Sequence, residues 1–559
     1  MTRPTKQPSL LQSFIPLIFL VALLGTNVAF YGDNSLGGAN QIALLLSAGV
    51  AAFVAMFNGE KWDVLFDGAV SSISSALPAL IILLMIGALA GTWLISGVVP
   101  AMIYYGLEVL NPTIFLFATC IVCSIVSVAT GSSWTTVATV GVALMGIGRI
   151  LGFSDGMIAG AIISGAYFGD KMSPLSDTTN LAPAMAGTDL ITHIKHMMWT
   201  TFPSITISAL IFLVLGFTSG SGADLQGVES LQSAISSKFN ISLWLFLVPL
   251  GVIGLIVKKV PAVPALLAGA ILGGIFAIGF QGDRIYETGA TYSYEVSGLN
   301  DGERIEWLGD DTPSSSRWYN LSPTNYEVAL LNENDEQLEV LPILLENNYL
   351  TEKLMFTGAS GFQVSVKRAP FAIASYQSVI NAMTTNVAIV SGNAVADELL
   401  SSGGMNGMLG TIWLIICAMT FGGIMEASGM LERIAQSILK LAHTTGSLIA
   451  STAGTCLVFN VTASDQYLAI VVPGRMFAKE YEKRGLAPEN LSRTLEDSGT
   501  VTSALVPWNT CGAYHAGVLG VATGTYLPFA FFNIISPLMT VLFGYMGWKV
   551  NDLKKAGAE

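Results

Sequence analysis

Long apolar runs recur along this chain and leave few folds open. Eight of them come close to the roughly 20 mostly apolar residues that a helix needs to cross a bilayer: 9–30, 39–57, 76–99, 198–217, 243–257, 263–280, 409–425 and 526–548. A buried helix of a soluble protein would carry a polar face, and these runs mostly do not. Only 11% of the residues are charged, against about 25% in soluble domains. The sequence therefore predicts an all-α polytopic membrane protein.

Lysines and arginines predict the orientation, because they favour the cytoplasmic side. The first run follows Arg3 and Lys6 as a signal peptide would, but it is long and no clear cleavage site follows, so we expect an uncleaved span. The other candidate cytoplasmic residues are Lys61, Lys195, Lys258, Lys259, Lys549, Lys554 and Lys555. Both termini are therefore expected in the cytoplasm.

Residues 281–370 are a different kind of sequence. They hold 15 acidic and 6 basic residues, which gives −9 of the net charge of −13. Residues 291–296 and 361–366 alternate as exposed strands do. We expect a small β-rich extracytoplasmic insertion at 281–370, with a first membrane repeat at 1–218 and a second one at 219–280 and 371–559. Nucleic acid is excluded as a partner, because it would require a basic surface.

Polar stretches interrupt the apolar sequence at matching places in the two halves. They are Gly131–Thr136 and Ser173–Asn180 in the first half, and Thr462–Gln466 and Val506–Thr510 in the second. Inverted repeats with discontinuous helices at corresponding positions mark the central binding site of transporters. We therefore predict two inverted repeats of about five spans each. In each repeat we expect a helix broken at the first stretch and a re-entrant hairpin with its tip at the second.

One loop conflicts with this arrangement. Inverted repeats with those hairpins place residues 479–493 outside the cell. The loop carries four basic residues, which favour the cytoplasm: Lys479, Lys483, Arg484 and Arg493. Two short full spans, 445–460 and 467–477, would keep the loop inside and would break the symmetry. We expect the inverted arrangement.

The stretch Gly169–Asn180 offers the ligands of a hard cation. Pro174 lacks an N–H group, so the helix is expected to stop near Ser173 and to restart after Ser176. Such a break is tolerated in a bilayer only where it is buried in protein or lines a watery cavity. Hydroxyls and carbonyls coordinate Na⁺, and this stretch contains no arginine for an anion. The further candidate ligands in it are Thr178 and Asn180.

Acidic side chains in the polar stretches are the main candidates for ion or proton binding. Asp170 and Asp177 lie in the first half and Asp465 in the second, and we expect Na⁺ at Asp177 and Asp465. An acid at the bilayer centre costs about 2.5–3.5 kcal/mol, so a proton or a cation has to neutralise it. Competition between Na⁺ and a proton for one carboxylate is the simplest mechanism of antiport. Alternatively, Lys171 pairs with an aspartate, most simply its neighbour Asp170, and only holds the hairpin.

The remaining polar residues of the stretches complete the predicted ion or substrate site. They are Ser132, Ser133, Thr135, Thr136, Ser464, Asn509 and Thr510. Hydroxyls in helices also bond back to their own backbone, which is the structural alternative. Glu496 and Asp497 precede the fourth stretch and suit a helix cap or contact with water equally well.

The same stretches resemble the NhaC family of bacterial Na⁺/H⁺ antiporters. Gly131–Thr136 and Gly160–Pro183 carry the likeness in the first half, and Gly422–Glu426, Glu496–Thr500 and Pro507–Thr510 carry it in the second. The resemblance implies the wider ion transporter superfamily, with inverted repeats and re-entrant hairpins. It also implies elevator-like movement of a transport domain against a scaffold, and a homodimer in the bacterial inner membrane.

Secondary active transport in the lipid bilayer is therefore the predicted function. Sodium/proton antiport leads, with no cofactor beyond the transported Na⁺ and H⁺. The family also resembles carriers that exchange organic acids such as malate for lactate, so a Na⁺- or H⁺-coupled exchanger of small organic acids or amino acids stays open. An enzyme is not expected, since the sequence has no evident Ser–His–Asp set, metal cluster or phosphate loop.

Overall fold

The computed structural model describes residues 7–31, 37–109, 112–174, 176–219, 225–258, 260–289, 292–308, 325–344 and 353–553. In this part of the chain seven helices are long and apolar enough to cross a membrane, and two further bent pairs pass the same test. The predicted run 39–57 is one helix with those bounds. The run 76–99 belongs to a helix that begins earlier, at Trp62. Arg3, Lys6, Lys259, Lys554 and Lys555 lie outside the described residues.

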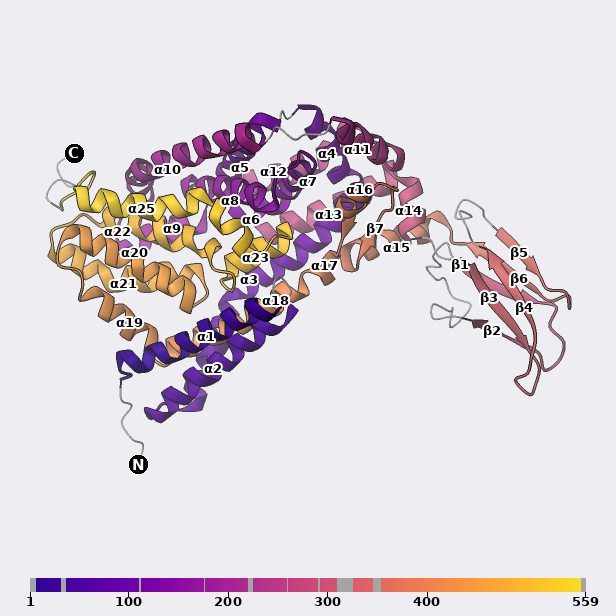
Figure 1. The fold of residues 1–559 in the computed structure, drawn as a ribbon, viewed down its shortest axis with the longest axis horizontal. Coiled ribbons are helices and arrows are strands. Elements are labelled where there is room, and N and C mark those ends of the chain that lie inside the picture. The colour runs from indigo at the N-terminus through magenta and orange to yellow at the C-terminus, as the bar shows by residue number, and fades with distance from the viewer. Residues whose placement is uncertain are drawn as a thin grey trace.

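The elements follow one another from the N-terminal end to the C-terminal end of the chain (Figure 1). The first helices are α1 (Leu10–Tyr31), α2 (Ala39–Phe57), α3 (Trp62–Ile95), α4 (Val98–Val109), α5 (Phe115–Thr130), α6 (Ser133–Thr136), α7 (Val142–Ile150), α8 (Asp155–Met172), α9 (Asp177–Ala186) and α10 (Leu190–Ser219). Those up to the insertion are α11 (Leu225–Lys238), α12 (Leu247–Val257), α13 (Ala262–Phe280) and α14 (Gly282–Gly289).

The remaining helices follow the insertion. They are α15 (Phe371–Thr384), α16 (Ala394–Leu399), α17 (Gly404–Gly407), α18 (Leu409–Ala427), α19 (Met430–Leu439), α20 (Thr445–Thr462), α21 (Gln466–Lys483), α22 (Pro488–Leu495), α23 (Thr510–Leu519), α24 (Thr523–Tyr526) and α25 (Phe531–Met546). A two-stranded ladder of β7 (Val387–Ala388) and β8 (Ser401–Ser402) lies between α15 and α17. Two π-helical segments, Val137–Gly141 and Glu496–Thr500, continue α6 and α22.

Two pairs of helix segments fold back on themselves at a polar stretch. Phe115 at the start of α5 stacks on Phe153 just after α7, with ring centroids 5.6 Å apart. Arg484 after α21 donates to the carbonyl of Thr444 before α20 over 3.1 Å. The first and third polar stretches are therefore the tips of two hairpins, α5–α7 and α20–α21.

The second and fourth polar stretches interrupt helices that run on through the molecule. α8 begins beside Phe529, whereas Gly187 after α9 shares a pocket wall with Lys479 at the open end of the second hairpin. α22 begins where Ala487 donates to the carbonyl of Asn551, and in Figure 1 α23 lies further along the molecule, near α3. Both crossings, α8–α9 and α22–α23, are thus broken helices.

The expected positions of hairpin and broken helix are therefore wrong, and the two are exchanged. The backbone at the breaks explains the difference. Gly131 (φ 70°) and Ser464 (φ 60°) are left-handed, a conformation that ends a helix and turns the chain. Ser173 and Ser176 are extended (φ −85°, ψ 128° and φ −69°, ψ 138°), so the chain continues past them. Asn509 is extended in the same way (φ −69°, ψ 147°).

The second hairpin removes the conflict over the basic loop 479–493. Because α20–α21 turns back, the loop lies at the same end as the C-terminal segment: Leu486 bridges Asp552, and Arg493 donates to the carbonyl of Lys549 over 2.9 Å. In Figure 1 the β-insertion projects from the opposite end. Neither an outside loop nor two full spans at 445–460 and 467–477 is needed.

The insertion forms two three-stranded antiparallel sheets. One has the order β1-β6-β5, from β1 (Tyr292–Ser297), β6 (Gln363–Arg368) and β5 (Lys353–Thr357). The other has the order β2-β3-β4, from β2 (Arg304–Leu308), β3 (Asn325–Leu331) and β4 (Gln337–Leu344). Trp307, Val328 and Ile343 of this second sheet share a hydrophobic core with Val364 of the first sheet and with Phe362, which directly precedes β6. The expected β-rich insertion is confirmed.

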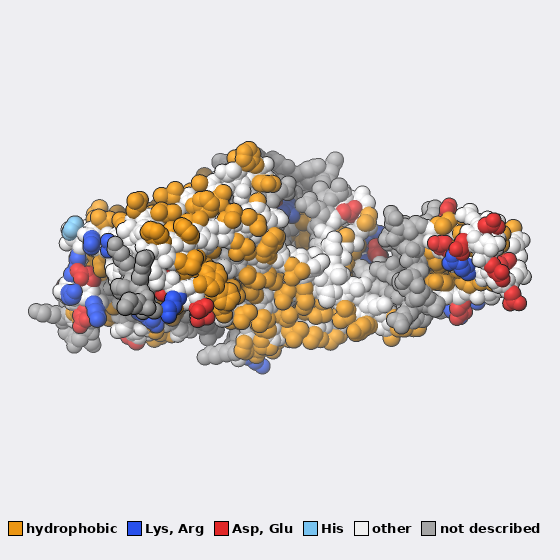
Figure 2. Space-filling view, turned by 90° about the horizontal axis from the view of Figure 1, so that it is seen from below, with side chains coloured by type: hydrophobic (Ala, Val, Ile, Leu, Met, Phe, Trp, Pro, Cys, Tyr) orange, Lys and Arg blue, Asp and Glu red, His pale blue; other side chains and the backbone are white. Residues whose placement is uncertain are grey.

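Apolar side chains cover the middle of the molecule, and charged side chains gather at its two ends (Figure 2). Inside this apolar belt are separate cores. One holds α1, α2, α3, α13 and α18 together, and others pack α5 on α8 and the second hairpin on α9 and α22. The polar stretches meet where these cores adjoin.

Candidate functional site

Each of the four breaks restarts its helix with a polar N-cap. Ser132, Ser176, Asp465 and Asn509 accept a backbone N–H over 3.2, 3.4, 3.0 and 3.0 Å. N-caps satisfy amide groups that the missing preceding turn leaves open. The sequence therefore places short polar residues at the breaks for a structural reason, and this also brings their neighbours to one place.

A single cavity receives side chains from all four breaks and from α3. It holds about 850 Å³ of empty space, part of it open to solvent. Six predicted site residues line it: Ser132, Thr135, Asp170, Asp177, Asp465 and Thr510. Ser75, Ala76, Pro78 and Ile82 of α3 form part of the wall, together with Trp134, Gln466 and Tyr467.

Asp170 is held by Ser133 at the end of α8. The Ser133 hydroxyl and backbone N–H both donate to Asp170 Oδ2, over 2.6 and 3.1 Å. Asp170 is only 6% exposed, and its Oδ1 has no hydrogen-bond partner in the described part of the chain. A buried carboxylate oxygen without a donor is available to a cation or a proton.

Asp177 lies in the first turn of α9 and is the most open of the three aspartates. It accepts the Thr178 N–H over 2.9 Å and the hydroxyl of Tyr467 from the second hairpin. Asp177 thus connects the broken helix α8–α9 to the tip of the second hairpin. Electrostatically it acts on both Asp170 and Asp465.

Asp465 caps α21 and is 4% exposed. The preceding Ser464 has a buried hydroxyl without a partner among the described residues, and its carbonyl accepts the Thr510 N–H over 2.9 Å. This bond ties the second hairpin tip to the start of α23. Oxygen atoms from two breaks therefore lie together beside Asp465.

The other predicted residues hold the breaks and do not line the cavity. Asn180 donates to the carbonyls of Pro174 and Ser176, and Asn509 donates to Asn460. Thr136 donates to the carbonyl of Ser132, and the hydroxyls of Ser176 and Thr178 share a hydrogen bond. Ser173 is buried.

Lys171 does not neutralise Asp170. Its ammonium group forms an ion pair with Asp497 and also donates to Ser536 over 2.9 Å. The Thr200 hydroxyl donates to the other carboxylate oxygen of Asp497, Oδ2, over 2.8 Å. The alternative of Lys171 as counter-charge to its neighbour is therefore wrong, because the side chain points to α22–α23 and α25. Glu496 and Asp497 are both fully buried, so neither faces water.

The oxygen ligands around the cavity fit a hard cation. No group of three or more His, Cys, Asp or Glu in the described ranges is arranged to hold a metal ion. Asp170, Asp177 and Asp465 have no ion-pair partner among the described salt bridges, and hydroxyls and helix ends surround them. Na⁺ uses such mixed oxygen ligands.

Sequence reasoning missed Tyr467 and the α3 wall. Tyr467 follows the third stretch directly, and its aromatic ring in an apolar helix gave no signal of the bond to Asp177. Pro78 inside α3 was the available sign of an irregular helix, since proline removes a backbone donor. Trp134 stacks on Tyr514 with centroids 3.9 Å apart, which packs the first hairpin tip against α23.

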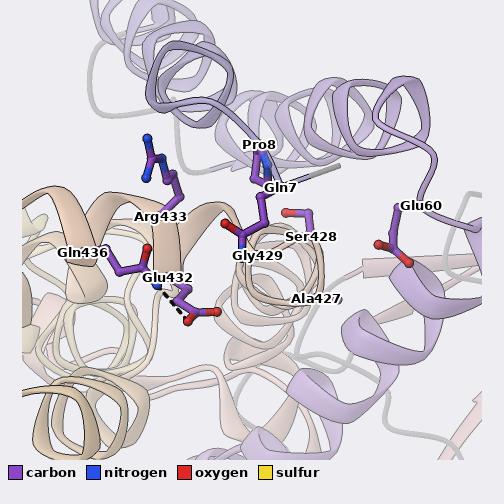
Figure 3. Close-up of a pocket in the computed structure, with 9 residues that line it drawn as sticks. All are labelled: Gln7, Pro8, Glu60, Ala427, Ser428, Gly429, Glu432, Arg433 and Gln436. Atoms are coloured by element: carbon purple, nitrogen blue, oxygen red, sulfur yellow. Dashed lines mark hydrogen bonds between the residues drawn. The ribbon is translucent and has the colours of Figure 1, made fainter. Parts of the chain in front are cut away.

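A second pocket lies away from the breaks (Figure 3). Its wall combines the N-terminal segment, the α2–α3 connection and the start of α19, and includes Glu60, Glu432 and Arg433. Gln436 donates to Glu432 over 3.0 Å. None of the predicted site residues takes part in it.

Known proteins match this chain over most of its length. The Na⁺/H⁺ antiporter family matches residues 165–305 and 314–548, with the gap inside the insertion. The Na⁺/H⁺ antiporter NhaC of Alkalihalophilus pseudofirmus is 33% identical over 507 residues, 91% of this chain and 90% of that protein. The malate-2H⁺/Na⁺-lactate antiporter of Bacillus subtilis is 34% identical over 508 residues (91% and 89%).

The arginine/ornithine antiporter ArcD of Halobacterium salinarum is 31% identical over 552 residues, 98% of this chain and 94% of that protein. Similar sequences thus bear the names of antiporters with different cargoes. Together with the apolar helices and the broken-helix cavity, these matches show that the chain belongs to the Na⁺/H⁺ antiporter family.

Proposed function

We propose that this protein is a sodium/proton antiporter whose ion site is the cavity between the breaks. The observation that carries the proposal is the meeting of Asp170, Asp177 and Asp465 on one cavity. None of the three has an ion-pair partner among the described residues. Desolvated carboxylates so close together require a cation or protons. Na⁺ and H⁺ therefore compete for the same charge.

Reconstituted protein tests this function. An imposed Na⁺ gradient across proteoliposomes should drive proton flux in the opposite direction, and Asp177→Asn should abolish the flux. Asp63→Asn, at the exposed start of α3, is the matched control and should transport normally. Full activity of the Asp177→Asn variant would remove Asp177 from the mechanism.

The architecture supports two inverted repeats, at 1–218 and at 219–280 with 371–559, with 281–370 inserted. α1, α2, α3, the first hairpin, α8–α9 and α10 would correspond to α12, α13, α18, the second hairpin, α22–α23 and α25. Each repeat then has five spans and one hairpin. Elevator-like movement would carry the hairpins and broken helices past α3, which lines one wall of the cavity. The further proposals are a homodimer, cytoplasmic termini and an extracytoplasmic insertion in the bacterial inner membrane.

An exchanger of organic acids or amino acids is the second candidate. The cavity is larger than a bare ion requires, and α6, α9, α21 and α23 begin at it, where helix N-termini favour carboxylates. Thermal-shift measurements with Na⁺, carboxylates and amino acids separate the two functions. Stabilisation by an organic ligand alone would contradict simple Na⁺/H⁺ antiport.

A further inference from the structure

Glu496 is a buried carboxyl group outside the cavity lining and has no ion pair among the described residues. It is 0% exposed and does not line the cavity. Its Oε1 accepts the hydroxyl of Thr178 over 3.1 Å, and its Oε2 has no hydrogen-bond partner in the described ranges. The adjacent Asp497, in contrast, is paired with Lys171. Of these two consecutive acids, only Asp497 has an ion-pair partner among the described salt bridges.

A chain of hydroxyl groups connects Glu496 to the cavity. Thr178 Oγ1, which donates to Glu496, lies 3.2 Å from Ser176 Oγ. Ser176 is the N-cap residue directly before Asp177, and Asp177 lines the cavity. Hydroxyls both donate and accept, so such a chain can pass a proton.

The local backbone also singles out this position. Glu496 begins a π-helical segment, Glu496–Thr500, and single π turns inside α-helices occur frequently at functional sites. The side-chain amide of Asn460, in the second hairpin, donates a hydrogen bond to the carbonyl of Gly499 over 2.7 Å. The segment is thus fixed against the hairpin that carries Asp465.

Two charged groups of α8 act on Glu496 electrostatically, Lys171 and Asp170. The elements that pack against the π segment are α9, α10, α20, α21, α22 and α25. Of these, α20 and α25 contain no Asp, Glu, Lys, Arg or His. The titratable groups on the other four elements are Asp177 on α9, His193, Lys195 and His196 on α10, Tyr467, Arg475, Lys479, Glu480, Tyr481, Glu482 and Lys483 on α21, and Glu489 and Arg493 on α22.

We infer that Glu496 carries the exchanged proton, whereas Na⁺ binds in the cavity at Asp170, Asp177 and Asp465. This inference rests on the proposed function and adds a second, separate proton site to it. With the cavity empty, Glu496 holds a proton, because a buried carboxylate without a partner is costly. Ser176 and Thr178 conduct that proton to and from the cavity.

Electrostatics couple the two sites. Ionised Asp170 repels negative charge on Glu496 and so helps to keep the proton there. Na⁺ bound at Asp170 cancels this repulsion, and Glu496 releases its proton through the hydroxyl chain. One positive charge arrives and one leaves, and by linkage a proton on Glu496 weakens Na⁺ binding to the same degree.

Na⁺ binding to purified protein between pH 5.5 and 8.5 tests the inference. With one proton released per Na⁺, the Na⁺ affinity of the native protein should rise about tenfold per pH unit while Glu496 is protonated. Glu496→Gln should still bind Na⁺, but it should release about one proton fewer per Na⁺ into a weakly buffered solution than the native protein, and its affinity should rise about tenfold less per pH unit. The control is Glu489→Gln at the start of α22. Glu489 accepts a hydrogen bond from Asn551, and this variant should behave as the native protein.

The possible outcomes are distinct. Native pH dependence and proton release in Glu496→Gln would overturn the inference. Absence of Na⁺ binding in the native protein would instead refute the proposed function. If Glu496→Gln does not fold, Thr178→Val carries the test: it should keep about one proton per Na⁺ but slow stopped-flow proton release at least tenfold, and native release rates would overturn the hydroxyl chain and with it the role of Glu496.

Discussion

Ser133 donates two hydrogen bonds, over 2.6 and 3.1 Å, to one oxygen of the Asp170 carboxylate. These bonds fix the carboxylate, and its Oδ1 has no hydrogen-bond partner among the described residues. Hydrogen bonds to charged groups contribute about 1.5–3 kcal/mol. Orientation by a hydroxyl, unlike an ion pair, keeps the negative charge available. The residues around the aspartates therefore position charge without neutralising it.

Ser133→Ala should weaken Na⁺ binding. The variant removes the shorter bond and lets the Asp170 carboxylate rotate, so we expect a loss of roughly tenfold or more in affinity, the equivalent of about 1.5 kcal/mol. Calorimetric titration of purified protein with Na⁺ measures it. Ser124→Ala, whose hydroxyl only bonds its own helix at Cys120, is the control. Equal affinities in the two variants would contradict this role of Ser133.

Lys171, in contrast, neutralises a carboxylate, because it forms a fully buried ion pair with Asp497. Lys171→Met should lower stability by about 3–5 kcal/mol, since it leaves a buried carboxylate without its partner. The double variant Lys171→Met with Asp497→Leu should recover much of the loss. Thermal unfolding in detergent compares the three proteins, and a single variant as stable as the native one would refute a buried ion pair.

α8 lies very close to α5, because glycines face the contact. A Cβ added at Gly165 would lie 2.2 Å from the carbonyl oxygen of Cys120, and one at Gly169 would lie 2.4 Å from Ser127 Cβ. Ser127 also donates to the carbonyl of Ala166 over 2.6 Å. The broken helix and the first hairpin are therefore one packed unit, which positions Asp170 against Ser133.

Gly165→Ala should push this unit apart. Backbone atoms cannot yield as a flexible side chain does, so we expect a loss of about 1–3 kcal/mol in stability and weaker Na⁺ binding through the shifted Asp170. Melting temperature and Na⁺ titration measure the two effects. Gly254→Ala in α12, where nothing lies within 4 Å of the added Cβ, should change neither. A stable Gly165→Ala variant with native affinity would show that the contact is not required.

The positions of the breaks were predictable, but their shapes were not. Polar residues and proline inside apolar runs cannot continue a buried helix, so stretches such as Ser173–Asn180 follow from composition alone. Whether the chain turns back depends on one backbone angle: Ser464 is left-handed, which its residue type does not favour. The partner of Lys171 was equally hidden, since Asp497 is 326 residues away in the sequence.

The two ends of the molecule differ in their charge. The basic loop 479–493 is tied to the C-terminal segment, and the acidic β-insertion lies at the other end. Lys and Arg favour the cytoplasm, so the loop end should be inside and the insertion outside. This orientation satisfies the charge rule together with the proposed inverted repeats, in which the two hairpins enter from opposite ends.

Single cysteines test this orientation in cells. All five native cysteines are buried, so background labelling by a membrane-impermeant maleimide should be low. The Asp335 side chain in the insertion is 71% exposed and that of Lys483 in the loop is 73% exposed, so both positions are reactive once replaced by cysteine. Asp335→Cys should be labelled in intact cells from which any outer membrane has been removed. Lys483→Cys should be labelled only after the inner membrane is opened. Labelling of both from outside would contradict the arrangement, because the loop end and the insertion end of the molecule would then face the same side of the membrane.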